Sequence, residues 1–445
     1  MTNIYNGVSR TSCQSMELLG RQCHLIAITA VISLVVAMPA RAQDQQRLAQ
    51  NGLAVTVASQ FAYDDNVLRQ QTDQIGSRVW QLNPKVRYQF QTSGGTYYLN
   101  YDLNHMEYLD SSQDTVTNQI LSGGVEERLN SSNKFTIDGS YNHGYEARGV
   151  GFNEAANALS LDRPTLLTIS EIDGKYQLGR DNHGLRFTAS VGHRSTKRDS
   201  PLIVDDSRNY NENYYGLMLQ YRVASRTDLA VEYRHEEVSY PRTPTAADGT
   251  QTPLDSADEQ YLIGADLEAT AKTTGKVRVG FSSRHFGWKS AQWADASTAQ
   301  TSSTAPATTT TTTTLPTDSD NAMFWEFAAV WAPLSYSRFE FSARTSERES
   351  LGVGSFVSSK DYSLIWTHQW SNRTRSRFDF TFGTDDYHDT ARVDDRKMYN
   401  LRMEYDFNKV VNLGFGLSYQ TMKSSFARAE FDKSIYYVFL NYRNR

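Results

Sequence analysis

The residues best suited to chemistry lie near the C-terminal end of the chain. They are Asp385, Asp386, His388, Asp389, Asp394 and Asp395. Carboxylates beside an imidazole could activate a water molecule as a general base, or they could bind a divalent cation. The simpler interpretation is an acidic loop in contact with solvent. We favour this interpretation because no converging nucleophile and base accompany these residues.

Other arrangements that would indicate an enzyme are missing from the sequence. It contains no Gly-x-Ser-x-Gly elbow, no His-Glu-x-x-His helix and no phosphate-binding loop. Both cysteines, Cys13 and Cys23, lie in a segment that we expect to be removed, which excludes disulfides and thiolate metal sites from the mature chain. We therefore predict a protein without catalysis, metal or cofactor, and we expect no nucleic-acid partner.

The N-terminal segment has the pattern of a signal peptide. A basic residue, Arg21, precedes the apolar run 25–38 and an Ala-Arg-Ala sequence at 40–42. The apolar run is shorter than the roughly 20 residues that a membrane-spanning helix needs. We predict that residues 1–42 are removed as a signal peptide and that residues 43–52 form a short periplasmic segment.

The rest of the chain alternates between apolar and polar residues with a period of two. Within residues 80–90, every second side chain is apolar and those between them are polar, as in a strand with two unlike faces. The 26 Tyr, 20 Phe and 7 Trp against 10 Pro suit strands as well. Eleven segments show the pattern clearly, and they begin near residues 80, 97, 135, 185, 215, 229, 277, 339, 378, 401 and 413.

Seven further segments alternate less regularly, which brings the expected number of strands to eighteen. These are residues 53–63, 119–129, 165–178, 259–271, 323–332, 361–370 and 434–442. The connections alternate between tight turns, such as 93–95, and long polar loops, such as 240–258. Short periplasmic turns and long extracellular loops are typical of barrels in the bacterial outer membrane.

We therefore predict an all-β fold for residues 53–445. The fold is a transmembrane antiparallel up-and-down β-barrel of about eighteen strands in the bacterial outer membrane. A soluble β-solenoid or propeller would also have many short strands, but it would show a fixed sequence repeat. The longest loop, around 287–322, contains seven consecutive threonines at 308–314, and we expect it to be extracellular and disordered.

The polar faces of the eleven clear strands carry more basic than acidic residues. Fourteen Lys and Arg stand against eight Asp and Glu, although the whole chain has a net charge of −5. Ion pairs that only stabilise the barrel wall are one interpretation, but the surplus of cations favours an anionic solute. The candidates that we expect to face the lumen are Lys85, Arg87, Arg186, Arg222, Arg234, Arg278, Arg338, Arg377 and Arg402.

The end of the first expected strand carries a short recognisable motif. Its residues are Tyr63, Asp64, Asp65, Asn66, Val67, Leu68 and Arg69. This motif resembles the Tyr-Asp-Asp-Asn-hydrophobic-hydrophobic-Arg signature of the putative beta-barrel porin 2 family, which includes the EpsL-type proteins of exopolysaccharide operons. The resemblance implies an outer-membrane porin that works with a machinery for polysaccharide synthesis and export. The chain departs from that family at 297–318 and at its end, 441–445, which lacks a terminal aromatic residue.

Taken together, these features predict a passive channel that exports an acidic exopolysaccharide. An eighteen-stranded barrel is wide enough for an aqueous lumen, whereas the side chains of an eight-stranded barrel fill it. The expected partners are outer-membrane lipid, the barrel assembly machinery, the polysaccharide and a periplasmic polysaccharide export protein. The alternatives are a general or sugar-uptake porin, and a surface enzyme or adhesin built on a barrel.

Overall fold

The computed structural model describes most of the chain after residue 50. The described residues are 51–154, 156–181, 184–199, 209–242, 254–270, 272–286, 319–350, 354–426 and 429–444. The predicted signal peptide, most of the periplasmic segment and most of the Thr-rich loop lie outside these residues. No helix within the described ranges is long and apolar enough to cross a membrane.

Strands make up almost all of the described chain. They are β1 (Gly52–Asp64), β2 (Ser77–Gln91), β3 (Gly95–Tyr108), β4 (Val116–Asn130), β5 (Asn133–Glu146), β6 (Thr165–Leu178), β7 (Leu185–Asp199), β8 (Tyr210–Ala224), β9 (Thr227–Ser239), β10 (Ser256–Thr270), β11 (Thr273–Phe286), β12 (Ser319–Leu334), β13 (Ser337–Glu349), β14 (Phe356–Gln369), β15 (Thr374–Tyr387), β16 (Val393–Asp406), β17 (Val411–Ser424) and β18 (Phe431–Asn444). Short helical segments lie in two of the connections: η1 (Ser112–Asp114), η2 (Gly151–Asn153) and α3 (Ala156–Ser160).

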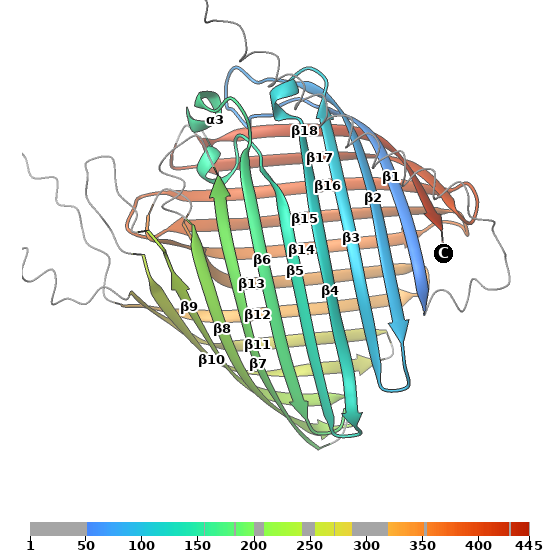
Figure 1. The fold of residues 1–445 in the computed structure, drawn as a ribbon, viewed down its shortest axis with the longest axis vertical. Coiled ribbons are helices and arrows are strands. Elements are labelled where there is room, and N and C mark those ends of the chain that lie inside the picture. Colours follow the sequence, from blue (N-terminus) through green and yellow to red (C-terminus); the bar gives the residue numbers. More distant parts are fainter. Residues whose placement is uncertain are drawn as a thin grey trace, which may run out of the picture.

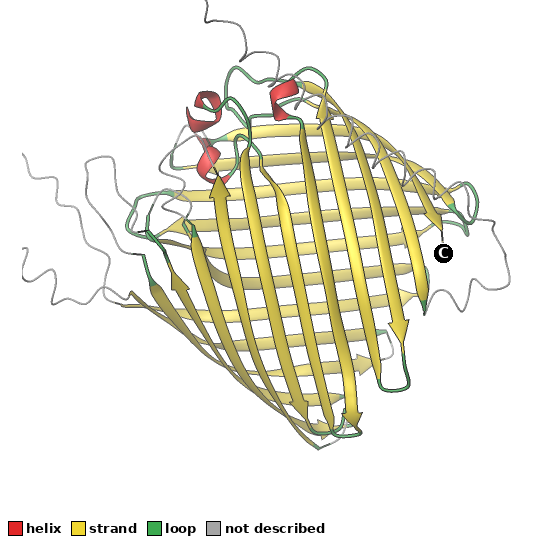
Figure 2. Ribbon diagram, in the orientation of Figure 1, coloured by secondary structure: helices red, strands yellow, loops and turns green. Residues whose placement is uncertain are grey.

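The eighteen strands form one closed antiparallel sheet. Each strand pairs with the next along the chain, and β1 pairs with β18 to close the barrel. In Figure 1, β2–β7 form the near wall and β12–β17 pass behind them at a steep angle. The helical segments gather at the end of the barrel where the longer connections lie (Figure 2). The predicted fold class and the predicted count of eighteen strands are confirmed.

The outer surface of the barrel follows from the alternation in the sequence. Apolar side chains such as Leu219, Phe281 and Phe415 are 43%, 72% and 55% exposed, because they point away from the lumen. In water such a surface would be unfavourable, but in a membrane it is covered by lipid chains. The irregular last strand follows the same rule, since Tyr436 and Val438 also point outward and are more than half exposed.

The strands are longer than a membrane requires. They contain 13 to 16 residues, whereas a membrane-crossing strand needs about 9–11. Their ends therefore project beyond the lipid and shorten the loops. The acidic residues between Asp385 and Asp395, which we expected to lie in a loop, instead lie at the end of β15, in a short turn and at the start of β16.

Candidate channel wall and mouth

All nine predicted cations lie on the inner side of the barrel, opposite the exposed apolar residues. The strand register shows this for Arg278, which lies beside Glu326 of β12 and Gly264 of β10, while its neighbour Val279 is exposed on the outer surface. The same register places Arg377 directly beside Arg402 on the inner face. The polar face of each strand therefore lines the lumen.

Eight of these nine cations are paired with a carboxylate, with nitrogen–oxygen distances of 2.5 to 3.0 Å. The pairs are Lys85–Asp102, Arg186–Asp228, Arg222–Asp228, Arg234–Glu326, Arg278–Asp266, Arg338–Glu340, Arg377–Asp379 and Arg402–Glu404. Arg87, the ninth, donates to Gln89 at 2.9 Å, and its guanidinium lies over the ring of Tyr98. The wall of the lumen is a lattice of opposite charges.

The expected surplus of positive charge on the wall is therefore wrong for the described strands. Several of the acidic partners lie where the sequence pattern was weak. Asp266 lies on β10 and Glu326 on β12, two of the seven irregular segments, and Asp228 lies in β9 next to a turn. A count of charged residues on the eleven clear strands alone includes the cations but leaves out their partners on β10 and β12. Fixing the register of each weak strand from its clear neighbours would have revealed them.

Arg278 is the most deeply buried of these cations. Its side chain is 2% exposed, and its guanidinium lies 3.0 Å from Asp266 and 3.4 Å from Glu232. A side chain at Gly264 would collide with it, since a Cβ there would be 2.8 Å from the Arg278 Cδ. Because a buried charge without its partner is strongly unfavourable, this ion-pair group holds β9, β10 and β11 in register.

A second part of the wall is rich in amide side chains. A cavity of about 370 Å³ in the inner face of β2–β5 is lined by Gln81, Asn83, Asn104, Asn118 and Asn142, among others. Gln81 donates to Asn104 at 2.6 Å, which fixes both side chains. Amides donate and accept hydrogen bonds, as sugar hydroxyls do. This wall can therefore bind a hydroxyl-rich solute without a preference for charge.

The family signature lies where β1 and β18 close the barrel at its mouth. The Nζ of Lys433 is 2.7 Å from the Oδ2 of Asp64, and both side chains are buried. The backbone N–H of Ser434 donates to Asp65 at 2.7 Å. These two contacts join the last strand to the first strand beyond the regular ladder of backbone hydrogen bonds. Asp64 and Asp65 of the signature thus stabilise the junction between β1 and β18, which we call the seam.

The next residues of the signature extend the same seam into the β1–β2 connection. Asn66 is fully buried, and its side-chain amide donates to the backbone oxygen of Asp432 at 2.8 Å. Arg69 adopts a φ of 53°, and its guanidinium lies 5.8 Å from the ring centre of Phe431. Tyr63 points outward and is 48% exposed. The signature residues therefore have structural roles at the mouth.

The β1–β2 connection supports the connection between β5 and β6. Val67 and Leu68 pack against Ala158 of α3, and all three are buried. The chain approaches so closely that a Cβ at Gly149 would lie 2.0 Å from the backbone oxygen of Leu68, and Gly149 has a φ of +81°. Only glycine tolerates both conditions, so the contact depends on this residue.

A buried arginine ties the β5–β6 connection to the β3–β4 connection. Arg148 is 3% exposed and donates to both carboxylate oxygens of Asp114, at 2.7 and 2.6 Å. It also donates to the backbone oxygen of Leu161 at 3.0 Å. Bidentate pairs of this kind fix orientation as well as distance. Arg148 therefore anchors both ends of the β5–β6 connection at the mouth of the barrel.

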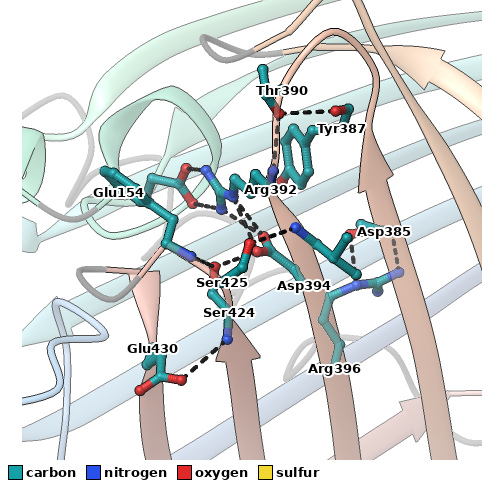
Figure 3. Close-up of polar contacts among 12 residues, drawn as sticks. Glu154, Asp385, Tyr387, Thr390, Arg392, Asp394, Arg396, Ser424, Ser425 and Glu430 are labelled. Carbon is teal, nitrogen blue, oxygen red and sulfur yellow. Dashed lines mark hydrogen bonds and ion pairs between the residues drawn. The ribbon is translucent and has the colours of Figure 1, made fainter.

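From this segment, Glu154 reaches Arg392 in the connection between β15 and β16 (Figure 3). Nη2 of Arg392 donates to Glu154 at 3.0 Å and to Asp394 at 2.6 Å, and the guanidinium lies 4.3 Å from the ring centre of Tyr387. Burial disfavours the charge of Arg392, but the hydrogen bonds to Glu154 and Asp394 outweigh burial and raise the pKa of its guanidinium.

The Glu154–Arg392 contact connects two distant sides of the barrel. Along the closed sheet, β1–β4, β17 and β18 separate the β5–β6 connection from the β15–β16 connection. The two residues are 238 positions apart in the sequence, and no local pattern indicates that they meet. The contact links the segment 148–161 to the far rim, and we call it the mouth latch.

The acidic grouping near the C-terminus also belongs to the mouth. Asp385 is 2% exposed and pairs with Arg348 at 2.9 Å and Arg396 at 2.8 Å. The ring of His388 stacks on Phe356 with 4.0 Å between the centres. Among the described residues, no group of three or more His, Cys, Asp or Glu could hold a metal ion. The expectation of a solvated loop is wrong for Asp385 and Asp394, because both are buried in ion pairs.

Comparisons with solved structures find outer-membrane proteins of low sequence identity. The structure is similar to the FrpB iron transporter of Neisseria meningitidis (F5-1 variant), with 12% identity and a TM-score of 0.46 over 86% of this chain and 64% of FrpB. It is also similar to the outer membrane protein opdK of Pseudomonas aeruginosa, with 9% identity and a TM-score of 0.44 over 88% of this chain and 99% of opdK. The chain therefore spans less than two thirds of the length of FrpB. None of the curated proteins matches the sequence.

The sequence profile of one family, described as putative beta-barrel porin 2, matches residues 321–444, which span β12–β18. The signature at Tyr63–Arg69 lies outside this match, on the strand that closes the barrel against β18. The family and the closed barrel also agree on the cellular location. The protein is a porin-like β-barrel of the bacterial outer membrane, and its residues 321–444 match the putative beta-barrel porin 2 family.

Proposed function

We propose that the barrel is a passive conduit through which an exopolysaccharide leaves the cell. The observation that carries the proposal is the inner wall, where amide side chains lie beside charges that are already paired. Such a wall offers a sugar polymer many hydrogen-bond partners and few strong binding points that would stop its passage. The family resemblance supports the same function, because it implies a partner machinery for polysaccharide export.

The ion pairs change one part of the expected substrate. The expectation of an acidic polymer depended on unpaired cations in the lumen, and eight of the nine candidates are paired. We therefore leave out the acidic character of the polymer and keep the polysaccharide. A periplasmic export protein, docked at the end with the short turns, would deliver the polymer to the channel.

Deletion of the gene tests this function. Export predicts that the deletion strain loses its surface polysaccharide, retains polymer in the periplasm and grows normally on small sugars. Expression of the intact protein from a plasmid should restore the surface polymer. Normal surface polysaccharide together with slow growth on one particular sugar would instead support the sugar-uptake porin.

A further inference from the structure

A large polar cavity is set into the inner wall formed by β6–β13. Its volume is about 760 Å³, enough for more than one sugar ring, and nine acidic and six basic side chains line it. Most of the basic side chains are held by acidic neighbours. Arg194, for example, lies 2.9 Å from Glu171 and 3.2 Å from Glu212. Arg234 and Lys276 both pair with Glu326, at 2.8 and 3.3 Å.

Three carboxylates of this cavity remain without a basic partner at ion-pairing distance among the described residues: Asp173, Glu236 and Asp258. Asp258 accepts hydrogen bonds from the hydroxyl of Ser282 at 2.6 Å and from the amide of Gln260 at 2.7 Å, and its side chain is buried. Asp173 accepts a hydrogen bond from Tyr214. The cavity therefore carries excess negative charge in a wall that is otherwise balanced.

The ring of Tyr214 packs against the backbone of Gly192 in the wall of the same cavity. A Cβ at Gly192 would lie 2.2 Å from two ring carbons of Tyr214, so the ring covers the space that a side chain would fill. The hydroxyl of Tyr214 donates to Asp173 and to Glu171, the latter at 3.1 Å, which prevents the ring from turning into the lumen. Glycine at position 192 thus allows a fixed aromatic face beside the carboxylate of Asp173, which has no basic partner at ion-pairing distance within the described part of the chain.

We propose that this cavity binds cationic amino-sugar units of a saccharide. The ammonium groups of different units would be attracted to Asp173 on β6 and to Asp258 on β10, because carboxylates in a low-dielectric wall concentrate cations. The ring of one unit would lie on the face of Tyr214, and its hydroxyls would reach the surrounding carboxylates and amides. Acidic sugars would be repelled by the same groups. This inference depends on the proposed export function only for the origin of the saccharide.

Purified barrel in a planar lipid bilayer provides the test. Glucosamine hexamer, added to one side, should interrupt the ion current, and the interruptions should weaken as salt increases. The N-acetylglucosamine hexamer, which has the same backbone without charge, should block far less. A galacturonate hexamer should not block at the same concentration, and current interruptions by galacturonate alone would overturn the proposal.

Substitutions assign the binding to this cavity. Asp173→Asn should weaken block by glucosamine hexamer at least about tenfold, because a charge-assisted hydrogen bond is lost. Tyr214→Ala should weaken the block as well, and Tyr214→Phe, which keeps the ring but lacks the hydroxyl that fixes it, should weaken the block less than Tyr214→Ala does. Asp395→Asn is the matched change, because Asp395 lies on β16 outside the cavity and accepts a hydrogen bond from Thr384; it should leave the block unchanged. Equal effects of Asp173→Asn and Asp395→Asn would overturn the assignment.

The experiment separates this inference from the proposed function. If glucosamine hexamer binds but the deletion strain exports polysaccharide normally, the site stands and the export function fails. If the deletion strain loses its surface polymer but the hexamer does not block, export stands and the amino-sugar site is refuted. The open current of each variant shows whether it has folded into an intact barrel.

Discussion

The mouth latch should hold the channel in a state of low conductance. Glu154→Gln removes the charge that attracts Arg392 and leaves Arg392 paired with Asp394, so the rim itself should stay intact. The segment 148–161 would then be released from the β15–β16 connection while Arg148 still anchors its base. We expect more frequent and longer openings of the channel.

The size of the effect can be estimated from the contact. A hydrogen bond to a charged group contributes about 1.5–3 kcal/mol, and the side chain of Glu154 is 22% exposed, which favours the lower end. Since about 1.4 kcal/mol corresponds to a factor of ten, the ratio of closed to open channel should fall about tenfold. Arg392→Met should have a larger and less specific effect, because it leaves the buried carboxylate of Asp394 without its basic partner.

Single-channel recordings of the purified barrel measure this ratio directly. Glu430→Gln is the matched control, because Glu430 also lies at the mouth and accepts hydrogen bonds from Ser424 and Gln71 without bridging to the β5–β6 connection. Its recordings should resemble those of the unchanged protein. An open fraction that is equal in Glu154→Gln and the unchanged protein would refute the latch.

Three further predictions concern the wall and the topology. Arg278→Met should lower the free energy of unfolding by about 1.5–3 kcal/mol in a urea titration, because Asp266 loses its basic partner and Glu232 keeps only Arg234, whereas Arg338→Met should cost less than about 1 kcal/mol since that pair is largely exposed. In the same assay, Leu219→Arg should cost about 2–4 kcal/mol on the lipid face, while Gln220→Arg should be tolerated beside the inner carboxylates; equal costs would mean that the two faces are wrongly assigned. A peptide tag in the turn at Gly94 should resist antibody labelling of intact cells, and labelling there would invert the topology.

The sequence predicts the barrel well because each strand carries its own signal. Alternation places Arg278 inside and Val279 outside without knowledge of any other strand. The same rule places the nine candidate cations on the inner face. It fails for their partners, since Asp266 and Glu326 lie on strands where apolar residues such as Leu262 and Phe324 also occupy the inner face. The net charge of the wall can be predicted only when the inner faces of all the strands, including the irregular ones, are known.

The mouth could not be predicted in the same way. Glu154 and Arg392 lie in connections, where no alternation of apolar and polar residues indicates which side chains meet. Their contact forms only after the barrel has closed and the two connections have folded toward each other. The family signature shows the intermediate case. Its residues are recognisable from local sequence, but their function as a seam between β1 and β18 depends on partners such as Lys433 at the far end of the chain.

The most direct test of the account is transport of the polymer itself. Purified barrel would be inserted into lipid vesicles loaded with the extracellular polysaccharide of the producing bacterium and, in a separate batch, with glucose. The account predicts that the polysaccharide leaves the vesicles, and that Glu154→Gln speeds its release. Vesicles that release glucose but retain the polysaccharide, in the unchanged protein and in Glu154→Gln alike, would contradict the account and identify a porin for small solutes.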